Sequence, residues 1–144
     1  MFRKVLIAID EDGHAEAVVH YGGQLAQDVH GEVVVFHVVQ PPPTYATQAG
    51  MYLPEGELRR AATEHGREVL RTAAEKLPAE VPSRLVVKYG EHSAWREIVQ
   101  AAEREQADVI VLGAHSQANF ARPVLGSTAE KVSRHVKVPV LLVR

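Results

Sequence analysis

Short apolar runs alternate along the chain with longer segments in which apolar residues recur at helical spacing. Residues 5–9 and 33–39 form largely apolar runs between polar residues, a pattern typical of strands buried on both faces of a parallel sheet. Between them, apolar residues at i, i+3 and i+4 predict an amphipathic helix over residues 15–29, which Gly31 ends as a C-terminal glycine. The first third of the chain therefore predicts a strand-helix-strand unit.

The remaining sequence continues this alternation. Residues 41–43 are three prolines, which remove backbone donors and indicate an extended surface loop over residues 40–55. A long helix is predicted over residues 58–77, weakened by Gly66 and closed by Pro78 and Pro82. Further strands are predicted over residues 84–89, 108–112 and 138–143, with helices that begin after Ser93 and over residues 128–135. The pattern predicts an α/β fold in which a doubly wound, five-stranded parallel sheet carries helices on both faces.

Length and composition exclude several classes of function. A chain of 144 residues suits one domain over residues 1–144. With 16 basic and 18 acidic residues the net charge is -2, which predicts no binding to nucleic acid or to an anionic membrane. The absence of cysteine excludes disulfides, Cys-ligated zinc and a thiol nucleophile. The first apolar run stops at Asp10, too short for a signal peptide or a membrane span, so we expect a soluble, cytoplasmic protein.

The last third of the chain contains the outline of a phosphate cradle. An apolar strand runs into residues 113–116, a nine-residue loop follows, and residues 126–128 open a helix. A helix start presents unpaired N–H groups and the positive end of the helix dipole, which favour an anion without any charged side chain. The candidate phosphate contacts are Gly113, His115, Ser116, Gly126, Ser127 and Thr128, with Arg122 of the loop as a planar donor.

Gly113 and Ser127 also have purely structural explanations. Gly113 fits an ordinary turn after a strand. Ser127 and Glu130 have the spacing of a capping box, in which Ser127 accepts from the Glu130 amide and the Glu130 side chain reaches back. Because a hydroxyl can accept one hydrogen bond and donate another, capping and phosphate binding do not exclude each other.

Three acidic residues follow the first predicted strand. Asp10, Glu11 and Asp12 can hold a magnesium ion that bridges phosphate oxygens, or accept from a ribose hydroxyl. Asp12 is alternatively the N-cap of the first helix. Since the cluster adds negative charge beside the proposed phosphates, it argues either for a metal ion, with Asp10 as its ligand, or against a nucleotide.

The spacing Gly-x-x-Gly, nine residues, Gly-Ser/Thr resembles the ATP-binding signature of the universal stress protein family, with Ser116 at the second glycine position. The resemblance implies a Rossmann-like sheet of strand order 3-2-1-4-5, with a ligand crevice between the first and fourth strands. It places adenine against the main chain of Val38 and Val39, with Ala8 and Ile9 as an apolar wall. It further implies an ATP-binding protein of the stress response and a homodimer through residues 138–143, a strand that otherwise leaves an open edge.

Ser116 is the departure from the signature that bears most on ATP. If this position requires positive φ, serine is strained by about 1 kcal/mol or more. If φ is negative, serine is harmless and its hydroxyl adds a phosphate donor. Both possibilities remain open from the sequence.

Little in the sequence supports catalysis. The chain has no Walker lysine motif, no Gly-x-Ser-x-Gly elbow and no histidine pair at metal-binding spacing. We therefore predict no catalytic residues, and at most slow ATP hydrolysis. The alternative is a nucleotide-free, dimeric interaction or signalling module of the same fold. A phosphoryl-accepting receiver domain is excluded, because the third strand ends in Lys88-Tyr89-Gly90 without an aspartate.

Overall fold

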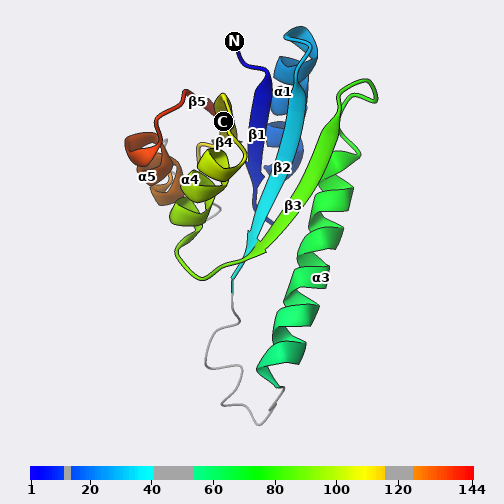
Figure 1. The fold of residues 1–144 in the computed structure, drawn as a ribbon, viewed down its shortest axis with the longest axis vertical. Coiled ribbons are helices and arrows are strands. Elements are labelled where there is room, and N and C mark those ends of the chain that lie inside the picture. Colours follow the sequence, from blue (N-terminus) through cyan, green and yellow to red (C-terminus); the bar gives the residue numbers. More distant parts are fainter. Residues whose placement is uncertain (12–13, 41–53, 116–124) are drawn as a thin grey trace.

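The computed structural model describes residues 1–11, 14–40, 54–115 and 125–144 of the chain. Figure 1 shows a central sheet with helices packed against both of its faces. The strands are β1 (Lys4–Ile9), β2 (Glu32–Val39), β3 (Ser83–Tyr89), β4 (Val109–Gly113) and β5 (Val140–Val143). The helices are α1 (Ala15–Asp28), α3 (Glu55–Ala74), α4 (Ala94–Arg104) and α5 (Ser127–His135).

All five strands are parallel and follow the order β3-β2-β1-β4-β5, which confirms the predicted doubly wound sheet. Successive residues of a strand point to opposite faces, so each central strand contributes to two cores. Ile7 and Val35 pack with α1 and α3 on one face, whereas Leu6 and Phe36 pack with α4 and α5 on the other. The carboxyl ends of all five strands consequently lie along one edge of the sheet.

The first helix ends differently from the sequence prediction. His30 has a φ of 54°, and the Gly31 amide donates to the Ala26 carbonyl at 2.8 Å. The left-handed residue is therefore His30, not the glycine. Gly31 is needed for another reason, because a Cβ there would overlap the carbonyl oxygen of Arg3.

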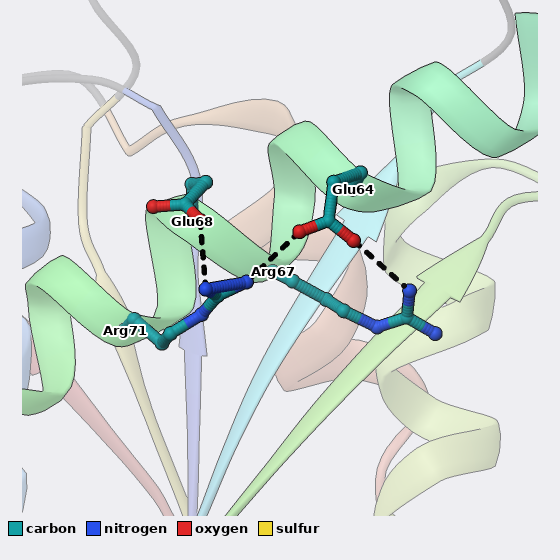
Figure 2. A network of polar contacts seen from close by, with 4 residues as sticks. All are labelled: Glu64, Arg67, Glu68 and Arg71. Carbon is teal, nitrogen blue, oxygen red and sulfur yellow. Dashed lines mark hydrogen bonds and ion pairs between the residues drawn. The ribbon is translucent and has the colours of Figure 1, made fainter.

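Helix α3 begins and ends three residues earlier than the apolar pattern predicts. Its first turn contains Glu55 and Glu57, which carry no apolar signal but favour the positive end of the helix. Its outer face is polar: Glu64 contacts Arg67 at 3.3 Å and Arg71 at 3.0 Å, and Glu68 contacts Arg71 at 2.7 Å (Figure 2). The predicted loop before this helix falls largely on residues 41–53, which lie outside the described residues.

The last strand is shorter than predicted, beginning at Val140 rather than at residue 138. Pro139 has no N–H to donate to the ladder, and its carbonyl accepts from the Ile110 amide at 3.0 Å. Among the described residues, no helix is both long enough and apolar enough to span a bilayer.

Candidate functional site

A pocket lies at the carboxyl ends of β1 and β4, where the chain connections leave the sheet in opposite directions. Ligands of doubly wound sheets bind at this kind of switch point. The cavity has a volume of about 100 Å³ and opens to solvent. Its described lining residues are Ala8, Ile9, Asp10, His14, Ala15, Val18, Phe36, Val38, Ala94, Ile98, Leu112, Gly113, His115, Gly126, Thr128 and Ala129.

Three helices direct their amino-terminal ends at this pocket. Ala15 opens α1, Ala94 opens α4, and Thr128 belongs to the first turn of α5. The N-cap residues are His14, Ser93 and Gly126; the first two make no side-chain capping hydrogen bond to their helices, and glycine has no side chain to make one. The positive ends of three helix dipoles therefore converge on one space, which favours a negatively charged ligand.

The first amides of α5 are available to a ligand, whereas two amides near the strand end are not. The Ala114 amide donates to the Val143 carbonyl at 2.7 Å, and the Gly126 amide donates to the Ala114 carbonyl at 2.7 Å. Both N–H groups are therefore already hydrogen-bonded within the protein. By contrast, the amides of residues 127–129 have no acceptor in the part of the chain that the structure describes.

The capping box that the sequence left open as a role for Ser127 is not formed. Gly126 holds the N-cap position, with φ −63° and ψ 152°, and Ser127 is the first residue of the helix. The Glu130 amide donates to the Gly126 carbonyl at 2.9 Å, and the Glu130 carboxylate pairs with Arg134. The helix begins one residue before the position predicted from the serine, so the Ser127 hydroxyl is exposed and not engaged in capping.

The apolar wall comes from the ends of β1 and β2. Ala8, Ile9 and Val38 line the pocket, and their contact with adenine stays a prediction. Val39 points to the other face of the sheet, because strand side chains alternate, and its Cγ2 lies against Gly66 of α3. A main-chain contact between Val39 and a ligand stays a prediction.

The acidic cluster after β1 divides between two surroundings. Asp10 lines the pocket. Glu11 does not, because its Oε1 lies 2.8 Å from Nε2 of His65 on α3. The Glu11 carboxylate thus faces His65 and not the pocket. Asp12 lies outside the described residues, although the N-cap position of α1 belongs to His14.

The predicted phosphate contacts and the predicted magnesium ligand are the remaining candidates. Gly113, His115, Gly126 and Thr128 line the pocket, and the Ser127 side chain does not. Ser116 and Arg122 lie outside the described residues. Within the described ranges, no group of three or more His, Asp or Glu side chains is arranged to hold a metal ion, so a role for Asp10 in binding magnesium stays a prediction.

The sequence analysis missed the lining residues at the helix starts and in the sheet core. They are His14, Ala15, Val18, Phe36, Ala94, Ile98, Leu112 and Ala129. A usable signal existed for the helix starts, because in a parallel α/β sheet every helix that follows a strand begins near the carboxyl edge. The core residues gave no such signal, since an aliphatic strand residue at a pocket looks like any other core residue.

Comparisons with known proteins cover the whole chain. The family model described as Universal stress protein family matches residues 1–144. The chain is 29% identical over 149 residues to universal stress protein YxiE of Bacillus subtilis, with full coverage of both proteins. It is 31% identical over 146 residues to universal stress protein MJ0531 of Methanocaldococcus jannaschii, covering 100% of this chain and 83% of that protein.

The fold is similar to solved structures as well. The structure of MJ0577, a universal stress protein of Methanocaldococcus jannaschii, matches with a TM-score of 0.81 and 26% identity, covering 99% of this chain and 96% of that one. The family model, the sequence similarity to full-length relatives and the similarity of fold support the same assignment. The chain therefore belongs to the universal stress protein family.

Proposed function

We propose that this protein binds an adenine nucleotide, with ATP as the expected ligand, in the pocket at the carboxyl ends of β1 and β4. The observation that carries the proposal is the convergence of three helix starts, without capping side chains, on one pocket that also has an apolar wall. A nucleotide has both chemistries, since its base is flat and largely apolar and its phosphates are anionic. Binding would act as a switch in a stress response by shifting the population of conformations that a partner recognises.

Two solved universal stress proteins support the choice of adenine nucleotides. One is a protein from Archaeoglobus fulgidus in complex with dAMP, with a TM-score of 0.68 and 20% identity. The other is a complex with cAMP, with a TM-score of 0.70 and 19% identity. At these identities they share the fold with this chain, and the ligand is carried over only as part of the proposal.

The proposed pose follows from the chemistry of the lining. The phosphates lie against the first turn of α5, where Thr128 and its neighbours offer main-chain N–H groups. The base lies between Ala8 and Val38. Asp10 faces the ribose hydroxyls, or a magnesium ion carried in on the phosphates of ATP.

We infer that the nucleotide is bound and not rapidly turned over. Fast phosphoryl transfer requires cationic groups at the terminal phosphate and a group that orients the attacking water. The described lining includes neither lysine nor arginine, and Asp10 is its single carboxylate. Hydrolysis should therefore be slow compared with binding.

A backbone substitution tests the proposed phosphate contact. Ser127→Pro removes the N–H of the first helical residue, where proline is well tolerated, and Gly126 already has the extended conformation that a following proline requires. We expect its affinity for AMP, cAMP and Mg-ATP, measured by calorimetric titration, to fall about tenfold or more, since a hydrogen bond to a charged group contributes about 1.5–3 kcal/mol.

Two controls separate this effect from unfolding and from the hydroxyl. Ser127→Ala keeps the N–H and should bind within about threefold of the wild type, since it removes only an exposed hydroxyl. Glu55→Pro makes the same change at the first residue of α3, distant from the pocket lining, and should not alter binding. If the folded wild-type protein bound none of the three nucleotides saturably, the proposed function would be refuted.

We also propose that two copies of the chain associate through β5. In the described sheet β5 pairs only with β4, so its outer edge offers unpaired backbone groups, and the Leu141 side chain is 41% exposed. This edge is the observation that favours the alternative function, a nucleotide-free dimeric module. Pairing of β5 with its counterpart would cover both the edge and the leucine.

Sedimentation velocity tests the dimer. At micromolar concentration the wild-type protein should sediment as a dimer, and Leu141→Lys, which places a charge at the proposed contact, should shift it to monomer. Leu85→Lys is the matched control, because Leu85 is similarly exposed, at 36%, on the opposite edge strand. A monomeric wild-type protein would rule out the dimer without affecting the nucleotide proposal.

A further inference from the structure

A buried histidine holds the end of the strand that delivers Asp10 to the pocket. His37 of β2 is 5% exposed, and its Nδ1 lies 2.9 Å from the carbonyl oxygen of Ile9, the last residue of β1. A carbonyl oxygen can only accept, so Nδ1 carries the proton and donates. The ladder between β1 and β2 ends at the Ile9–His37 pair, and the side-chain hydrogen bond is made where the regular pairing stops.

Both residues of this hydrogen bond adjoin the pocket walls. Ile9 lines the pocket, and Asp10 follows it directly. Val38, the residue after His37, lines the pocket from β2. The hydrogen bond therefore fixes the proposed base wall on one strand relative to the acidic residue on the other.

Helix α3 prevents the imidazole from moving away. Gly66 packs above the ring, and a Cβ at that position would lie 3.5 Å from Cδ2 of His37, 2.5 Å from Cγ2 of Val39 and 2.8 Å from Cγ2 of Val87. The neighbouring His65 contacts Glu11 at 2.8 Å through Nε2. The same turn of α3 thus packs against His37, which holds Ile9, and contacts Glu11, so the residues before and after Asp10 are both held, although the exposed His65–Glu11 pair is the weaker of the two contacts.

We propose that His37 is a positioning residue of the nucleotide site: by holding the Ile9 carbonyl, its Nδ1–H sets where Asp10 enters the pocket. The inference rests on the proposed function and adds a residue that does not touch the ligand. A buried carbonyl without its donor would seek another partner, and the main chain at Asp10 would shift with it.

Three variants test the role of the donor. His37→Leu removes it, whereas His37→Asn keeps an N–H at nearly the position of Nδ1. Val35→Ala is the control for stability, because Val35 is fully buried on the same face of β2, two residues earlier, and makes no side-chain hydrogen bond. Affinity for AMP is measured by calorimetric titration, and the midpoint of urea unfolding is recorded for each protein.

The expected pattern separates positioning from packing. His37→Leu should weaken AMP binding by about tenfold, His37→Asn should stay within about threefold of the wild type, and Val35→Ala should lose stability but keep its affinity. Equal affinities for His37→Leu and His37→Asn, or an affinity loss in Val35→Ala that matches its loss of stability, would overturn the proposal.

A second measurement decides the question even if the wild-type protein binds no nucleotide. Amide hydrogen exchange at Ala8 and Ile9, the buried last residues of β1, should become faster in His37→Leu and stay near the wild-type rate in His37→Asn. Exchange that is the same in both variants would contradict the positioning role. Absence of nucleotide binding with this exchange pattern intact would instead refute the proposed function alone.

Discussion

Glu97 of α4 is a buried carboxylate without a hydrogen-bond partner among the described residues. It is 2% exposed, and neither carboxylate oxygen has a hydrogen-bond partner within the described ranges of the chain. Burial of an unpaired polar group costs about 1–3 kcal/mol. Glu97 lies in the first turn of α4, where the helix dipole stabilises a negative charge by about 0.3–1 kcal/mol. The cost of burial is therefore the larger effect.

Glu97→Met should therefore stabilise the protein. We expect the free energy of unfolding, from urea denaturation, to rise by about 1–2 kcal/mol, because a flexible apolar side chain replaces an unpaired carboxylate of similar length. Glu103→Met on the exposed side of the same helix is the control and should change stability by less than about 0.5 kcal/mol. A destabilised Glu97→Met variant would show that the carboxylate has a partner in solution.

For single side chains, the sequence was informative where a residue ends a strand. Asp10 and Gly113 were predicted at the site because parallel strands end along one edge, and both line the pocket. His37 and Glu97 were not singled out, because their environments depend on residues far away along the chain. His37 contacts Ile9, 28 positions earlier, a separation that no local pattern reveals.

Helix α3 contains two glycines with opposite surroundings. Gly66 meets the sheet so closely that an added Cβ would lie 2.5 Å from Val39 Cγ2, whereas nothing lies within 4 Å of a Cβ at Gly56. Gly66 has a low helix propensity, which costs the helix some stability. Because glycine has no Cβ, however, it allows α3 to pack closely on β2 and β3. Substitution by alanine should therefore lower the free energy of unfolding at Gly66 but not at Gly56.

Gly66→Ala should lower the free energy of unfolding by about 1–3 kcal/mol through overpacking, despite the better helix propensity of alanine. Gly56→Ala, in the exposed first turn, should leave stability unchanged or raise it by up to about 1 kcal/mol. Urea denaturation of both variants measures the difference. If Gly66→Ala were as stable as Gly56→Ala, the close packing of α3 on the sheet would be wrong.

Element types were predictable, and their ends were less so. Periodicity found each of the described strands and helices, since their apolar faces are buried in the two cores. The starts of α3 and α5 were misplaced because each begins with polar or small residues that have no apolar signal. The misplaced start of α5 matters for function, because it put Ser127 at the N-cap position, which Gly126 occupies in the structure.

At the scale of the whole molecule, the site is formed by segments that are distant in sequence and meet at the carboxyl ends of the strands. Asp10 and Gly113 are brought together by the strand order, which the resemblance implied and the structure confirms. The contribution of Ala94 at the start of α4 requires the three-dimensional arrangement, because nothing local distinguishes it from any other helix start. Family membership adds the fold, whereas the helix starts, their available amides and the apolar wall supply the physical reason to expect a nucleotide.

The most direct measurement is a titration of ¹⁵N-labelled protein with AMP followed by NMR. The account predicts saturable shifts at the amides of residues 127–129, at Gly113 and at Val38, with little change along the outer face of α3. Shifts confined to another surface, or none at millimolar AMP in the folded protein, would contradict a nucleotide site at the carboxyl ends of β1 and β4.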